Sequence, residues 1–295
     1  MRVFVTGATG FIGSAVVSEL LANGHRVTGL ARSEKGASQL AAAGAEALRG
    51  SLGDFATLRR GAGAADGVVH VGFNHDFARF AESCEEDRRA IEILGSALEG
   101  TDRPLLVASG VAFLASGRAA TEADRPPAPS ADYPRASEAA AAALAARGVR
   151  ATAVRFPATV HGVGDHGFIP ILIRLAREKG AAYVGDGANR WPAVHRSDAA
   201  RAVRLALEHG GVDGPYHAVG EEGVPFKAIA EVIGRRLGVP VVAKSGPEAA
   251  EHFGWFTLFA GMDIPAASAR TRALLGWKPT GPTLLADIDQ PGYYD

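Results

Sequence analysis

The chain has 295 residues, 47% of them hydrophobic, so it can bury a large core and form one domain or slightly more. Its formal net charge is -1 and its charges are interleaved, so we expect no nucleic-acid partner. The single cysteine, Cys84, cannot form an internal disulfide and lacks metal-ligand spacing, so we expect a reducing cytoplasm and no metal. The chain starts directly on a strand pattern and has no run of about 18 apolar residues, so we expect no targeting peptide and no membrane partner.

The first predicted elements are a strand, a glycine-rich turn and a helix. Residues 3–6 are β-branched or aromatic, three glycines follow at intervals of three, and residues 15–25 show helical spacing. Glycines let backbone N–H groups approach a pyrophosphate, and the helix N-terminus faces the anion with unpaired donors. The pattern predicts dinucleotide binding rather than a merely structural turn. The predicted contacts are Gly7, Thr9, Gly10, Phe11, Ile12 and Gly13.

The second strand pattern, residues 25–36, predicts which dinucleotide is bound. Related folds often end this strand with Asp or Glu, which holds the ribose hydroxyls. Here that position is Ala31, followed by Arg32 and Ser33. A guanidinium can bind a 2′-phosphate through a charge-assisted hydrogen bond worth roughly 1.5–3 kcal/mol. We therefore expect NADP(H) to be preferred over NAD(H) by about ten- to a hundredfold. The alternative is that Arg32 is a solvated loop residue.

Strand and helix patterns alternate through the next hundred or so residues. Strands are predicted in 45–54, 67–73, 104–110 and 151–160, and helices in 76–100 and 136–148. This alternation predicts an α/β fold with a doubly wound, mostly parallel Rossmann sheet and a smaller C-terminal substrate-binding region. We expect an NADP-binding domain over 1–155, with returns to the sheet near 190–217, and a mainly substrate-binding region over 156–295.

Several segments resemble the short-chain dehydrogenase/reductase superfamily in its extended, epimerase/dehydratase-like branch. The likeness covers nearly the whole chain: TGATGFIG at 6–13, GSLGD at 50–54, VVHVGF at 68–73, LLVASG at 105–110, VRFPATVHGVGD at 154–165, VGDGANRWPAVHRSD at 184–198 and LLGWKP near the end. The resemblance implies further cofactor contacts at Ser51, Leu52, Val71, Gly72 and Pro157.

In that superfamily a Ser, a Tyr, a Lys four residues past the Tyr, and an Asn in the preceding helix carry the chemistry. Ser109 and Tyr133 match the first two, whereas Ser137 stands at the Lys position and Asp87 at the Asn position. The resemblance therefore implies an atypical member with an incomplete catalytic set. Arg135 is not expected to replace the Lys, because helix positions two apart point to different sides. Without that cation, Tyr133 should stay near its reference pKa of about 10 and remain protonated.

A protonated phenol suits reduction, because it can donate a proton to a carbonyl oxygen as hydride reaches the carbon. The sequence thus predicts an NADPH-dependent oxidoreductase in which Ser109 and Tyr133 hold and protonate a small carbonyl substrate. Each residue also has a non-catalytic alternative. Ser109 would be an ordinary hydroxyl at a strand end, Tyr133 an aromatic loop residue beside Pro134, and Asp87 a residue on a solvated helix face. Two other functions stay open: a non-catalytic NADPH-binding sensor or scaffold, and a sugar-nucleotide epimerase or dehydratase.

His75 and Asp76 follow the fourth predicted strand, and His161 and His166 follow the sixth. Each is either an alternative proton donor or a group that hydrogen-bonds the loop backbone. His195 and Asp198 are expected to be structural. Sugar-nucleotide members carry an Arg where this chain has Trp191 and Pro192, with Arg190 one place off, which weakens the epimerase interpretation. The substrate-pocket candidates are His75, Asp76, His161, His166 and Trp191.

Residues 252–262 are rich in aromatic side chains, with Phe253, Trp255, Phe256 and Phe259 close together. We expect some of them to line a pocket or an interface, with ordinary core as the alternative, and hence an aromatic or aliphatic substrate. The extended branch often dimerises through the helices after strands four and five, here 76–99 and 135–147. The resemblance therefore points to a homodimer.

Overall fold

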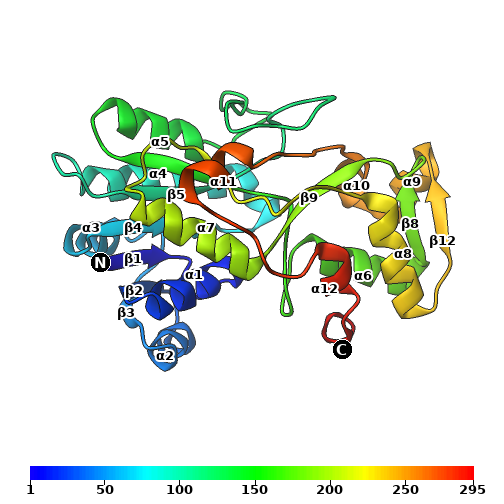
Figure 1. The fold of residues 1–295 in the computed structure, drawn as a ribbon, viewed down its shortest axis with the longest axis horizontal. Helices are drawn as coiled ribbons and strands as arrows, with labels where there is room; N and C mark the ends of the chain where they lie inside the picture. The colour runs from blue at the N-terminus through cyan, green and yellow to red at the C-terminus, as the bar shows by residue number, and fades with distance from the viewer.

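The computed structural model describes residues 1–295, except for the side chain of Phe77. Its centre is a parallel sheet with strand order β10-β6-β5-β4-β1-β2-β3 (Figure 1). The predicted doubly wound α/β fold is confirmed. The strands are β1 (Arg2–Thr6), β2 (Arg26–Ala31), β3 (Glu46–Arg49), β4 (Gly67–His70), β5 (Leu105–Gly110), β6 (Ala151–Phe156) and β10 (Tyr216–His217).

Helices cover both faces of this sheet, as the near-continuous apolar strands require (Figure 1). One core joins the sheet to α1, α2 and α7, with Val16 packed among side chains such as Val203. The other joins it to α3, α4 and α5, with Phe4 and Leu94 fully buried. These helices are α1 (Phe11–Ala22), α2 (Glu34–Ala42), α3 (Phe55–Ala64), α4 (Phe80–Ser96), α5 (Ser137–Ala146) and α7 (Arg196–Glu208).

The C-terminal half adds two small sheets and a separate core. The three-stranded sheet contains β7 (Thr159–His161), β9 (Arg190–His195) and β11 (Glu221–Pro225), and the two-stranded sheet contains β8 (Ala181–Val184) and β12 (Val241–Lys244). The helices here are α6 (Phe168–Lys179), α8 (Phe226–Leu237), α9 (Gly246–Phe253), α10 (Thr257–Gly261), α11 (Ala269–Leu275) and α12 (Leu284–Ile288). No helix in the described part of the chain is long and apolar enough to cross a bilayer.

The strand predicted over 151–160 is in fact two strands. Pro157 has no N–H to donate, so β6 ends at Phe156, and Thr159 begins β7 in the three-stranded sheet. Within the segment 190–217, β9 also joins that small sheet, while α7 packs on the central sheet and β10 pairs with β6. The chain therefore moves between the two halves more than once.

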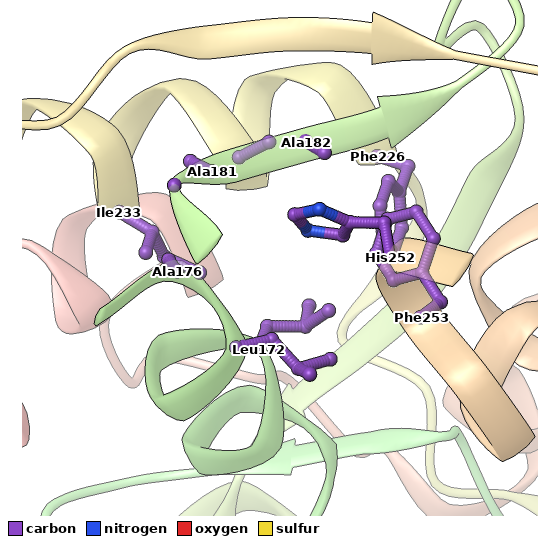
Figure 2. A pocket seen from close by; sticks show the side chains of 11 residues that line it. Leu172, Ala176, Ala181, Ala182, Phe226, Ile233, His252 and Phe253 are labelled. Atoms are coloured by element: carbon purple, nitrogen blue, oxygen red, sulfur yellow. The ribbon is translucent and has the colours of Figure 1, made fainter. Parts of the chain in front are cut away.

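The aromatic residues near position 255 mainly build the C-terminal core. Phe256 and Phe253 are buried there, together with Trp191, which is 1% exposed. Figure 2 shows a cavity beside Phe253, into which the ring of His252 projects. Its volume is about 10 Å³, space for roughly one water molecule. This cavity is too small for a carbonyl substrate, so the core alternative describes most of these aromatics better than the pocket.

Candidate active site

The glycine-rich turn between β1 and α1 is packed so closely that side chains cannot enter it. Gly7 has a φ of 67°, and a Cβ there would lie 2.6 Å from the Cα and N atoms of Gly72. A Cβ on Gly13 would lie 2.0 Å from the Gly7 carbonyl oxygen. The N-cap of α1 is Gly10, which offers no side chain to the N–H groups of the first turn. This cradle fits the pyrophosphate of a dinucleotide.

Several other predicted cofactor contacts lie around the same cradle. Gly72 follows β4 and faces Gly7, with a Leu52 methyl 3.3 Å from the place of its Cβ. The Thr9 side chain lies beside Gly36, in the first turn of α2. The hydroxyl of Ser33 caps that helix by accepting a hydrogen bond from the Gly36 N–H at 3.1 Å. The remaining predicted contacts are Val71 after β4, exposed Ser51 after β3 and buried Pro157 after β6.

Arg32 directly follows β2, and its side chain is exposed. Among the described residues it has no acidic partner, whereas Arg49 nearby pairs with Glu34 at 2.7 Å. Its charge is therefore free to meet a phosphate at the edge of the cradle.

Ser109 and Tyr133 belong to two ends of one long loop. Ser109 is the penultimate residue of strand β5, and Phe113 in the following loop packs edge-to-face on the Tyr133 ring, with 6.0 Å between centroids. Reciprocal hydrogen bonds between Ser130 and Tyr133 hold the tyrosine in place before α5 begins. No other described residue is hydrogen-bonded to the hydroxyl of Ser109 or of Tyr133. Both hydroxyls are thus available to a ligand.

Phe113 combines strain with exposure. Its φ of 66° lies in the left-handed region, which is unfavourable for a bulky residue, and its side chain is 46% exposed. Such strain is concentrated at functional sites in proteins. We therefore count Phe113 among the site residues, although nothing in the sequence indicated it.

Tyr133 remains protonated at neutral pH. Partial burial raises the pKa of its phenol above the usual value of about 10, although the charge of Arg135 acts in the opposite direction. This agrees with the predicted proton donor, but burial rather than the lack of a cation is the main cause.

Asp87 is the centre of a buried hydrogen-bond network, so the solvated-face alternative is wrong. It is 2% exposed, and its Oδ1 accepts a hydrogen bond from His70 Nε2 at 3.0 Å. Its Oδ2 accepts one from the Ser137 hydroxyl at 2.6 Å. The other nitrogen of His70, Nδ1, lies 2.7 Å from the Thr6 hydroxyl, which accepts a bond from the Gly72 N–H at 3.3 Å. The network therefore connects the cofactor cradle with the start of α5.

The electrostatics of this network follow from its donors. Although burial acts to raise the pKa of Asp87, the interactions with His70, the charge of Arg135 and the hydrogen bond from Ser137 together lower it. An ionised carboxylate only accepts hydrogen bonds, so His70 Nε2 is a donor. Hydrogen bonds from His70 and from Ser137 thus converge on Asp87. The sequence analysis did not single out His70, a polar residue that ends the apolar strand 67–70.

Arg135 lies where the sequence argument did not expect it. It precedes α5, which begins at Ser137, so the helical spacing used in that argument does not apply. Its Nε donates to the Ser137 hydroxyl at 3.2 Å, and its guanidinium lies 4.3 Å from the centroid of the Phe73 ring. A cation therefore does stand beside Ser137, the residue at the family's Lys position.

The histidine candidates are dispersed. His75 packs edge-to-face on Phe73, and partial burial together with the charge of Arg135 lowers its pKa. His166 packs on Phe11 at the cofactor cradle. The third, His161, is fully buried, so it cannot reach a substrate as proton donor.

Three residues named in the sequence analysis, His161, Asp76 and Asp198, make contacts that stabilise the fold. His161 Nδ1 contacts Asp287 of α12 at 2.8 Å. Asp76 accepts the Ala78 N–H at 3.1 Å and caps a short 3₁₀ turn, Phe77–Arg79. Asp198 accepts N–H groups of the C-terminal segment at 2.7–3.1 Å, in agreement with its expected structural role. Trp191, a pocket candidate, lies inside the C-terminal core instead.

Comparison with known proteins identifies the family of this chain. Residues 3–219 match the NAD dependent epimerase/dehydratase family. The chain belongs to this family. An uncharacterized protein of Schizosaccharomyces pombe, C2A9.02, is 49% identical over 297 residues, which cover 100% of both chains. The predicted relationship to the extended short-chain dehydrogenase/reductases is thus confirmed.

Two more distant relatives bear on chemistry and fold. The 4-hydroxy-2-methyl-3-oxo-4-farnesyl-3,4-dihydroquinoline-1-oxide ketoreductase of Stigmatella aurantiaca is 31% identical over 218 residues, 71% of this chain and 65% of its own. The dTDP-glucose 4,6-dehydratase DesIV of Streptomyces venezuelae, solved with NAD and TYD, has a TM-score of 0.78. It covers 100% of this chain and 97% of its own at 21% identity, so it supports the fold alone. The family makes this protein an enzyme of the NAD(P)-dependent oxidoreductase/epimerase type.

Proposed function

We propose that this enzyme uses NADPH to reduce a small carbonyl compound. Tyr133 protonates the carbonyl oxygen, and Ser109 binds that oxygen through its hydroxyl. The observation that carries the proposal is the half-buried Tyr133 phenol, which stays protonated and has no hydrogen-bond partner among the described residues. The ketoreductase among the relatives supports the same direction of reaction.

The proposal also names the residues that bind the cofactor. The turn of Gly7, Gly10 and Gly13 binds the pyrophosphate, and Arg32 binds the 2′-phosphate that distinguishes NADPH from NADH. When bound, the cofactor supplies a hydride. Of the chain's own residues, Ser109 orients the substrate oxygen and Tyr133 transfers the proton to it.

The first experiment follows NADPH oxidation with a panel of aromatic and aliphatic aldehydes and ketones. Wild type is compared with Tyr133→Phe, and Tyr183→Phe in β8 is the control for loss of a phenol elsewhere. We expect Tyr133→Phe to lose about a hundred- to ten-thousandfold in kcat and the control to lose none. Full activity in Tyr133→Phe would move the proton donor to His75 or His166.

A second candidate is a sugar-nucleotide epimerase or dehydratase. It is favoured by the family and by the fold shared with the dTDP-glucose 4,6-dehydratase. Against it, Arg190 is occupied by Asp263, which accepts its Nε–H at 3.0 Å and a terminal N–H at 2.9 Å. Tight calorimetric binding of UDP- or dTDP-glucose would favour this candidate. Absence of turnover with every carbonyl compound, while NADPH still binds, would favour the sensor or scaffold.

The assembly and location of the enzyme are proposals as well. A homodimer would form through α4 and α5, which lie side by side on one face of the central sheet (Figure 1). Sedimentation velocity measures the assembly directly. A cytoplasmic location agrees with the buried free thiol of Cys84.

A further inference from the structure

Arg135 is a half-buried cation without an acidic partner. Among the described residues, no carboxylate oxygen lies within 4.0 Å of its guanidinium, and only its Nε is hydrogen-bonded, to Ser137. The neighbouring Arg155 shows the contrast, because its Nε and one terminal nitrogen donate to Glu138 at 2.9 and 2.7 Å. Partly buried charges in proteins are usually paired. The terminal N–H groups of Arg135 therefore lack the partner that their position calls for.

The side chain of Arg135 is held in place although its charge is unpaired. The Phe73 ring lies on one side of the guanidinium, and the Ser137 hydroxyl accepts its Nε–H. Ser137 in turn is fixed by its 2.6 Å hydrogen bond to buried Asp87. An arginine loses rotamer freedom when it binds a ligand, and prior fixation lowers that cost. The Asp87 network thus presents an already oriented guanidinium.

The guanidinium lies on the side of the site where the proton donor is. Tyr133 is two residues away, and the charge of Arg135 acts on the Tyr133 phenol, on His75 and on Cys84. The cofactor's anionic groups are bound elsewhere, at the glycine turn and at Arg32. An anion for Arg135 must therefore come from the substrate.

We propose that Arg135 binds a carboxylate of the substrate, next to the carbonyl group that Tyr133 protonates, so that the substrate is an oxo acid. A carboxylate can accept two parallel hydrogen bonds from the planar guanidinium, which a neutral aldehyde or ketone cannot. This inference rests on the proposed reductase function for the reacting group, and on Arg135 itself for the carboxylate.

The test compares an oxo acid with its methyl ester, because esterification removes the negative charge of the group that Arg135 binds. Phenylglyoxylate and methyl phenylglyoxylate form one such pair. In Arg135→Gln we expect the KM for the acid to rise about ten- to a hundredfold and the KM for the ester to stay unchanged. Arg125→Gln is the matched control, since it removes an exposed positive charge from the same loop. Ser137→Ala, which frees the side chain without removing its charge, should raise the KM for the acid by less.

A binding measurement separates this inference from the proposed reaction. Calorimetry on the NADPH-loaded enzyme measures the affinity for benzoate, which cannot be reduced. Loss of benzoate binding in Arg135→Gln but not in Arg125→Gln supports the anion site, even if no carbonyl compound turns over and the reductase proposal fails. Equal effects of Arg135→Gln on acid and ester, or weaker NADPH binding with unchanged benzoate binding, would assign the guanidinium to the cofactor and overturn the inference.

Discussion

Removing the Asp87 carboxylate should destabilise the fold strongly at neutral pH. Asp87→Ala leaves two buried donors, His70 Nε2–H and the Ser137 hydroxyl, without their acceptor. Each such group costs about 1–3 kcal/mol, so the free energy of unfolding should fall by roughly 2–6 kcal/mol. Asp87→Asn keeps an oxygen for Ser137 and should cost less. Glu92→Ala on the same helix removes only an exposed ion pair with Arg88 and should cost less than about 1 kcal/mol.

The pH dependence provides a second check of the same reasoning. The pKa of Asp87 is lower in the folded state than the unfolded value of about 3.9, so its stabilisation is present above that value. The stabilisation is lost as the pH falls through the folded pKa. Urea unfolding of wild type and variants should therefore show a large difference at neutral pH and convergence in acid. The network would have no stabilising role if Asp87→Ala resembled Glu92→Ala at neutral pH.

Three further predictions concern the cofactor cradle and one partly buried carboxylate. Gly13→Ala places a methyl group 2.0 Å from the Gly7 carbonyl oxygen, so NADPH binding measured by fluorescence should be lost, whereas Gly63→Ala, in open space on α3, should bind normally. Arg32→Glu should reverse the preference for NADPH over NADH, which a comparison of the two dissociation constants measures. Asp165→Asn should raise the melting temperature above pH 6 and leave it unchanged near pH 4, because burial raises the pKa of this carboxyl to about 6 and ionisation therefore disfavours the folded state. An unchanged melting temperature at neutral pH would mean that Asp165 ionises freely in the folded protein.

The fold and the cofactor cradle could be predicted because their signals are local. The alternation of strand and helix patterns and the spacing of the three glycines can be read from short windows of the sequence. In the structure, a Cβ at Gly7 or Gly13 would lie 2.0–2.6 Å from backbone atoms, which explains why these positions are glycines. The break at Pro157 was visible too, but its consequence was not, because the transfer of Thr159–His161 to another sheet depends on the distant partner β9.

The catalytic side of the site could be predicted only in part. Ser109 and Tyr133 were assigned from their place in a motif, and their catalytic role stays a prediction. The connection of Asp87 to Ser137 spans 50 residues, and that of Thr6 to His70 spans 64, so no local pattern reveals either. The helical spacing used for Arg135 does not apply, because α5 begins two residues later, at Ser137. His161, which looked available in the sequence, is buried by a contact with Asp287, 126 residues away.

The converging hydrogen bonds at Asp87 also bear on how the enzyme would recover after each turnover. A proton can pass along a chain of hydroxyls and imidazoles only if every link points the same way. Here the donors from His70 and from Ser137 point toward the same carboxylate, so the network cannot relay a proton from the cradle to the start of α5. In the proposed reaction, Tyr133 would therefore regain its proton from solvent, next to the exposed ring of Phe113. Reprotonation of the phenol would then depend on the buffer and on solvent access to Tyr133. The buried Asp87 network would only hold its side chains in place.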